Sequence, residues 1–215
     1  MRVTSGGFSQ ILAWVSFFAY RDGAGNTHAM LSWIARKIFT ITGWTMVGEI
    51  PNIRKAVFIA APHTSNWDGL WLLIYKFAIK VDVRFLAKDT LFWWPLGPLL
   101  RSMGAMPIDR RNAAAIVPQL VEAFANEEHL FLALAPEGTR KRKPFWKSGF
   151  YRIAEAANVP IVLAFIDFNK REMGIGPALP SVISMEQTLA ELRKFYAPYV
   201  GRRPELQSKI GFPPD

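Results

Sequence analysis

The search for a general base in this sequence is short, because it contains three histidines and no cysteine. His28 begins a predicted helix and His129 follows two glutamates, so both are most simply explained as solvent-exposed residues. His63 differs, since a polar run separates it from a carboxylate, Asp68, five residues further on. On one continuous helix five residues would turn the two side chains roughly 140° apart, so a contact between them requires a turn.

Ser65 or Asn66 can provide that turn as the N-cap of a helix that begins near Trp67. Asp68 would then lie in the first helical turn, from which its carboxylate can fold back to the His63 imidazole. A carboxylate that orients an imidazole makes it an effective general base. Three other interpretations stay open for this stretch. They are a capped helix beside an incidental histidine, a Ser65 nucleophile lacking the usual Gly-x-Ser-x-Gly turn, and a zinc site lacking a second histidine or cysteine nearby.

Two further polar clusters could bind an anion. In the first, at residues 137–140, Gly138 would let backbone N–H groups approach the anion while Arg140 binds it through two parallel hydrogen bonds. In the second, Asp109 precedes another guanidinium, that of Arg110. Their simpler interpretations are a solvated basic loop and an exposed ion pair.

Short apolar runs alternate with helix-length segments after residue 48, a pattern typical of α/β domains. Strands are predicted at residues 56–61, 83–87, 105–108, 130–135 and 161–168. Helices are predicted at residues 67–79, 95–103, 113–126 and 149–157, and a last one from the shared apolar face of Met185, Leu189, Leu192 and Tyr196. The sequence therefore predicts a single α/β domain with a mostly parallel central sheet flanked by helices. Each polar cluster follows a strand, so we expect the clusters to converge at the carboxyl edge of the sheet, where such sheets bind ligands.

Residues 1–48 are predicted to form an apolar, helical N-terminal segment that associates with a membrane. Its two apolar stretches, residues 8–20 and 28–42, are each shorter than the roughly 18–20 residues that a transmembrane helix needs. They could lie as a hairpin in one leaflet or cover the core of the domain, and their pattern fits both. The apolar face expected for the second stretch consists of Leu31, Ile34, Ile38 and Ile41.

The sequence has 26 Lys and Arg residues and 17 Asp and Glu residues, which gives a formal net charge of +9. This excess of positive charge predicts an anionic partner. A mean hydropathy of +0.12 and eight tryptophans favour a membrane surface over nucleic acid. We therefore expect a peripheral or monotopic protein on the cytoplasmic face of a membrane.

Four motifs in one order resemble the glycerophospholipid acyltransferase family, typified by lysophosphatidic acid acyltransferases, also called 1-acyl-glycerol-3-phosphate acyltransferases. The resemblance covers about residues 56–166 and makes residues 49–215 an acyltransferase domain. It implies transfer of a fatty acyl group from a coenzyme A or acyl-carrier-protein thioester to a lipid hydroxyl, with no metal or redox cofactor. The motifs are His63-x-x-x-x-Asp68, Gly104-Ala-Met-Pro-Ile-Asp-Arg110, Pro136-Glu-Gly-Thr-Arg140 and Val159-Pro-Ile-Val162.

The resemblance also implies roles for individual residues. His63 would be the catalytic base and Asp68 its orienting partner. Backbone N–H groups near Gly138 are expected to stabilise the oxyanion. The acceptor phosphate would be bound by Arg110, Glu137, Gly138, Thr139 and Arg140, with Lys88 as a weaker candidate.

The partners implied are an acyl thioester donor, a phosphorylated lipid acceptor, an anionic membrane surface and acyl carrier protein, and no nucleic acid. Two other functions would use the same fold: a non-catalytic lipid-binding protein, or an acyl hydrolase in which water replaces the acceptor. Pro62, Ala135 and Lys141 differ from common family residues, but none removes a chemical group that the mechanism needs.

Overall fold

The computed structural model describes residues 25–109, 113–181 and 183–212, and within these residues one sheet forms the centre of the molecule. Its strand order is β1-β7-β6-β2-β5-β3-β4, and every neighbouring pair is parallel except β6 and β7. The predicted α/β class with a mostly parallel sheet is confirmed. The strands are β1 (Thr45–Val47), β2 (Lys55–Ala61), β3 (Val83–Lys88), β4 (Ala105–Ile108), β5 (Leu130–Leu134), β6 (Ile161–Asp167) and β7 (Glu172–Leu179).

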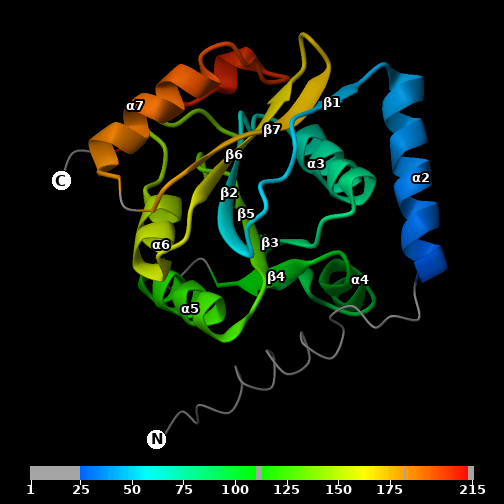
Figure 1. Cartoon of the computed structure of the whole chain (residues 1–215), viewed down its shortest axis with the longest axis horizontal. Coiled ribbons are helices and arrows are strands. Elements are labelled where there is room, and N and C mark those ends of the chain that lie inside the picture. Colours follow the sequence, from blue (N-terminus) through cyan, green and yellow to red (C-terminus); the bar gives the residue numbers. More distant parts are fainter. Residues whose placement is uncertain (1–24, 110–112, 182, 213–215) are drawn as a thin grey trace, which may run out of the picture.

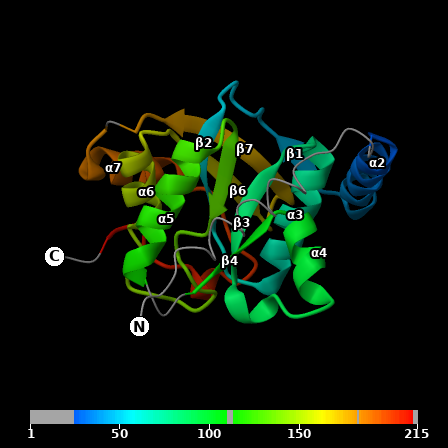
Figure 2. The same cartoon turned by 90° about the horizontal axis from the view of Figure 1, so that it is seen from below.

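Helices cover both faces of the sheet (Figures 1 and 2). From β2 the chain runs through β3 to the edge strand β4, then returns through β5 to β6 on the other side of β2. Crossovers between parallel strands are right-handed. The helices on the way from β2 to β4 therefore lie on one face of the sheet, and the helices on the way from β4 back to β6 lie on the other. One face carries α2 (Gly25–Thr42), α3 (Asn66–Ile79) and α4 (Leu96–Ser102), and the other carries α5 (Ala113–Asn126), α6 (Gly149–Ala157) and α7 (Met185–Tyr196). Short 3-10 helices occur at Asp89–Leu91 and Pro204–Leu206.

The two central strands supply core residues to both faces, which explains their nearly continuous apolar sequences. Alternate side chains of β2 and β6 point to opposite sides and are almost completely buried. Val57, Ile59, Ile161 and Leu163 pack in one cluster with Phe124, Ile153 and Leu192. Ala56, Phe58, Val162 and Ile166 pack in the other with Phe39, Tyr75 and Ala78.

The predicted strands and helices after residue 48 all occur, with bounds that differ by at most a few residues. Strands β1 and β7 were not predicted. β1 has three residues, and Gly174, Gly176 and Pro177 interrupt the apolar pattern of β7. These glycines have a packing role, because a Cβ on Gly174 would lie 2.3 Å from the Val47 carbonyl oxygen and one on Gly176 would lie 2.3 Å from the Phe195 ring.

Helix α2 packs on α3 through a face other than its predicted apolar stripe. Ala35 and Phe39 are buried, and Ser32 Oγ and Arg36 Nε both donate hydrogen bonds to the carbonyl oxygen of Ala78 (3.3 and 3.0 Å). The predicted apolar stripe, which consists of Leu31, Ile34, Ile38 and Ile41, is half-buried or exposed. No helix in the described ranges is long and apolar enough to cross a bilayer, and residues 8–20 lie outside those ranges.

Candidate active site

The turn between β2 and α3 brings His63 and Asp68 together. Ser65 is the N-cap of α3 and Asp68 is the third residue of the helix, as predicted. The Asp68 carboxylate folds back, so that Oδ2 accepts hydrogen bonds from the backbone N–H groups of Thr64 (2.5 Å) and Ser65 (2.7 Å), and Oδ1 accepts one from Ser65 Oγ (2.5 Å). This completely buried carboxylate therefore holds the loop that carries His63.

The His63 imidazole lies beside this carboxylate, with Nδ1 3.7 Å from Asp68 Oδ2. That distance is longer than a hydrogen bond, and the buried Nδ1 has no other partner among the described residues. A donor on Nδ1 needs only a small movement to reach Oδ2, and such contacts commonly shorten when substrate binds. The geometry fits a base whose orientation is set by a carboxylate.

Glu137 holds the same loop from a neighbouring strand. It follows β5, which is paired with β2, and its Oε2 accepts a hydrogen bond of 2.8 Å from the backbone N–H of His63. Glu137 is 2% exposed, so water is largely excluded from this hydrogen bond. The helices that follow β2 and β5 lie on opposite faces, so these two strands flank the switch point of the sheet, the position at which open α/β sheets bind ligands.

Burial and charge set the protonation of this site. Burial lowers the pKa of His63 below its ordinary 6.5, Asp68 opposes this shift, and the positive charge of Arg140 lowers the pKa further. The imidazole is therefore neutral near pH 7, the form that a base requires. Burial raises the pKa of Glu137 to about 7, the hydrogen bond from His63 N–H opposes this shift, and the negative charge of Asp68 adds to it.

Residues 138–140 form a turn above the carboxyl end of β5. Gly138 has a φ of +65°, and its N–H donates to the carbonyl oxygen of Ala135 (3.0 Å). That N–H is therefore engaged within the turn, and the expectation that backbone N–H groups near Gly138 stabilise the oxyanion stays a prediction. Thr139 Oγ1 accepts a hydrogen bond from Lys141 N (3.3 Å), whereas the side chain of Arg140 is exposed and near enough to act on the His63 pKa.

The other predicted anion ligands follow strands farther from β2. Lys88 is the exposed last residue of β3, which is separated from β2 by β5. Asp109 follows β4, one strand beyond β3, and Arg110 lies outside the described residues. The role of Arg110 stays a prediction.

Sequence reasoning missed a segment that covers the His63 loop. Residues 199–207 follow α7, and Arg203 N donates a hydrogen bond of 3.1 Å to Thr64 Oγ1. No periodicity or motif marks this contact, because the two residues are 139 positions apart and the segment lies beyond the four motifs.

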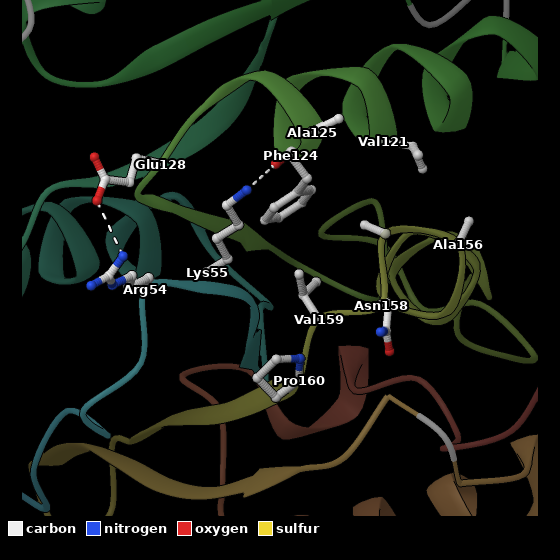
Figure 3. A pocket seen from close by; sticks show the side chains of 11 residues that line it. Arg54, Lys55, Val121, Phe124, Ala125, Glu128, Ala156, Asn158, Val159 and Pro160 are labelled. Atoms are coloured by element: carbon white, nitrogen blue, oxygen red, sulfur yellow. Dashed lines mark hydrogen bonds and ion pairs between the residues drawn. The ribbon is translucent and has the colours of Figure 1, made fainter.

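An open pocket of about 620 Å³ lies at the opposite edge of the sheet (Figure 3). Lys55 begins β2, Pro160 precedes β6 and Glu128 precedes β5, so this pocket is at the amino ends of the strands. The Lys55 ammonium donates to the carbonyl oxygen of Phe124 (2.6 Å), and Arg54 pairs with Glu128. This pocket is remote from His63 and contains no group suited to acyl transfer.

The chain is thus an α/β protein with a histidine–carboxylate pair at the carboxyl end of a strand, a candidate acid–base site. A family model described as "Acyltransferase" matches residues 39–166, more than half of the chain. The chain belongs to this acyltransferase family, which confirms the resemblance seen in the motifs.

Individual relatives agree with this assignment. A 1-acyl-sn-glycerol-3-phosphate acyltransferase of Streptococcus pneumoniae is 31% identical over 121 residues, 53% of this chain and 42% of the relative. One of Haemophilus influenzae is 28% identical over 159 residues, 68% of this chain and 63% of the relative. The matched part of the chain thus spans less than two thirds of either protein.

A solved structure shares the fold. The Thermotoga maritima 1-acyl-sn-glycerophosphate (LPA) acyltransferase, PlsC, superposes with a TM-score of 0.56 at 20% identity, over 88% of this chain and 85% of that one. The residues that bring His63, Asp68 and Glu137 together lie within the family-matched region, whereas residues 199–207 lie outside it.

The Glu137 carboxyl should give the protein a distinctive dependence of stability on pH. Its pKa of about 7 in the folded state exceeds the ordinary 4.5, so the folded state binds the proton more tightly. Stability therefore falls as pH rises through this window. Glu137→Gln keeps an oxygen acceptor for His63 N–H but does not ionise. We expect its free energy of unfolding, relative to the wild type, to increase by on the order of 3 kcal/mol between pH 4 and pH 8 in urea titrations.

Glu191→Gln, at an exposed position on α7, is the matched control for loss of a carboxylate. A difference between Glu137→Gln and the wild type that stays constant across this pH range would contradict the buried, proton-binding Glu137.

Proposed function

We propose that this protein is an O-acyltransferase that moves a fatty acyl group from a coenzyme A or acyl-carrier-protein thioester to the hydroxyl of a lysophospholipid, with 1-acylglycerol 3-phosphate as the acceptor. The observation that carries the proposal is the position of the His63 imidazole, 3.7 Å from the buried Asp68 carboxylate at the carboxyl end of a strand. Arg140 lies near enough to lower the pKa of this imidazole. Family membership and the names of the relatives support the same reaction.

In the proposed mechanism both substrates bind before chemistry. The neutral His63 imidazole accepts the proton of the acceptor hydroxyl while that oxygen attacks the thioester carbonyl carbon. Asp68 stabilises the resulting imidazolium, and the carbon–sulfur bond then breaks. The imidazolium returns its proton to the departing thiolate, so the products are an ester and a free thiol, and no acyl-enzyme forms.

Positive side chains would bind the acceptor phosphate beside this base. Arg140 follows β5 and Lys88 ends β3, which is β5's other neighbour in the sheet. Arg110, after β4, completes the proposed set. A guanidinium and a phosphate form parallel hydrogen bonds, which fixes the acceptor while its hydroxyl reaches His63.

We further propose that the protein attaches to the cytoplasmic face of an anionic membrane through residues 1–48. Within this segment, α2 is the outermost element on its side of the molecule (Figure 1). Met30, Trp33, Ile34 and Ile41 are exposed along α2, with Lys37 beside the Trp33 ring at 5.8 Å. An exposed apolar stripe with a tryptophan and a lysine suits the headgroup boundary of a bilayer.

The Trp33→Ser/Ile41→Ser double variant should bind anionic vesicles at least about tenfold more weakly, because it removes two large apolar groups from the proposed contact. Vesicle co-sedimentation measures the binding and thermal unfolding measures stability, which should change little. Met185→Ser, at an exposed apolar position on α7, is the control. Unchanged vesicle binding with a lower melting temperature would mean that other residues of the chain cover this stripe.

His63→Ala should lower kcat/KM for acyl transfer by about 10²–10⁴-fold, the usual contribution of a general base. His129→Ala, at an exposed histidine, should leave it unchanged. Asp68→Asn should also lower kcat/KM. Because the Asp68 charge raises the His63 pKa, its loss should move the acid limb of the pH profile, already below pH 6.5, to still lower pH. A His63→Ala variant that retains more than about 5% of the activity would contradict the general-base role.

A further inference from the structure

The segment that follows α7, residues 199–207, is anchored across the carboxyl edge of the sheet, and we call it the C-terminal strap. Phe168 N, directly after β6, donates a hydrogen bond to the carbonyl oxygen of Val200 (3.0 Å). The Gln207 side chain accepts a hydrogen bond from Gly201 N (3.1 Å) and donates one to the carbonyl oxygen of Tyr199 (3.3 Å). These bonds fix the course of the strap.

The strap touches the His63 loop on both sides of the histidine. Arg203 N donates to Thr64 Oγ1, and a Cβ on Gly201 would lie 2.8 Å from that same oxygen and 3.3 Å from Pro62 Cβ. Glycine is therefore required for this close approach. The side chains of Arg202 and Arg203 consequently start at the rim of the loop that carries the proposed base.

Arg202 lies against two aromatic rings beside the start of α3. Its guanidinium carbon is 5.1 Å from the ring centre of Trp67, in the first turn of α3, and 5.9 Å from that of Phe168. A guanidinium is attracted to the faces of aromatic rings, so these contacts hold the Arg202 side chain in place. Arg202 and Arg203 are both exposed, and neither pairs with a carboxylate within the described ranges.

The strap arginines and Arg140 border the His63 loop from opposite sides. The strap is bonded next to the end of β6, whereas Arg140 follows β5, and these strands are the two neighbours of β2. Both substrates of the proposed reaction can carry phosphate. A site that binds both substrates can therefore use more than one cationic group to bind phosphate. Guanidinium groups are suited to this, because their planar donors match phosphate oxygens.

We infer that Arg202 and Arg203 form a second phosphate-binding pair at the mouth of the active site, which takes a phosphate monoester of one of the two substrates. This inference rests on the proposed acyltransferase function. The shared chemistry is a phosphate monoester, which occurs in the headgroup of a lysophosphatidate acceptor and on the ribose of coenzyme A.

The test compares the Arg202→Gln/Arg203→Gln double variant with the wild type on substrates that differ only in this phosphate. The acceptors are lysophosphatidate and the monoacylglycerol of the same chain length, and the donors are acyl-CoA and acyl-dephospho-CoA. We expect KM for one phosphate-bearing substrate to rise at least about tenfold, because charge-assisted hydrogen bonds are lost. KM for its phosphate-free counterpart and kcat should stay within about twofold. A rise for lysophosphatidate assigns the pair to the acceptor, and a rise for acyl-CoA assigns it to the donor.

The Arg152→Gln/Lys194→Gln variant removes the same charge from exposed positions on α6 and α7 and is the matched control. The inference is overturned if KM is unchanged for both phosphate-bearing substrates, or if the control variant or the phosphate-free substrates show the same rise. Weaker binding to anionic vesicles with unchanged KM values would also overturn it and assign the pair to membrane docking.

Direct binding separates this inference from the proposed function. In a His63→Ala background, equilibrium dialysis of labelled lysophosphatidate and of labelled coenzyme A requires no turnover. The strap substitutions should weaken binding of one of these compounds at least about tenfold, and equal binding of both would overturn the inference. Absence of acyl transfer by the wild type would contradict the proposed function alone.

Discussion

Two buried carboxylates hold the loop between β2 and α3, and the candidate active site depends on them. Asp68 binds the backbone of Thr64 and Ser65 from within the loop, and Glu137 binds the backbone of His63 from the neighbouring strand. Together they fix the chain on both sides of the imidazole without contacting its Nε2. The loop is thus positioned by hydrogen bonds to its backbone, which leaves the histidine side chain available for chemistry.

The same arrangement has an electrostatic consequence. Asp68 and Glu137 act on each other as like charges in a buried region, and this interaction adds to the desolvation that raises the Glu137 pKa to about 7. His63, between them, has a lowered pKa because burial and Arg140 together outweigh the attraction of Asp68. The candidate site therefore combines a neutral imidazole with the nearby positive charge of Arg140, which suits the proposed acceptor, both a proton donor and an anion.

The sequence predicted those parts of the structure that depend on local pattern. β2 and β6 were found because both faces of each are buried, and the turn at Ser65 was found because N-cap chemistry is local. The parts that were missed depend on distant contacts. Glu137 accepts its hydrogen bond from a residue 74 positions away, and the polar ligand role expected for it gives no hint of this contact. Strand β7 was missed because its glycines break the apolar pattern, although they allow close contacts with other parts of the fold. The face of α2 that packs on the domain could not be predicted because it depends on where the helix lies on α3.

The central claim is that the neutral His63 activates a lipid hydroxyl rather than water, and the fate of a labelled acyl thioester tests it most directly. The wild-type protein is incubated with the thioester in the presence and absence of lysophosphatidate, and the labelled products are separated. We expect labelled diacyl product and free thiol in equal amounts, and only when the acceptor is present. Release of labelled fatty acid at the same rate with and without the acceptor, or no consumption of the thioester at all, would contradict the claim.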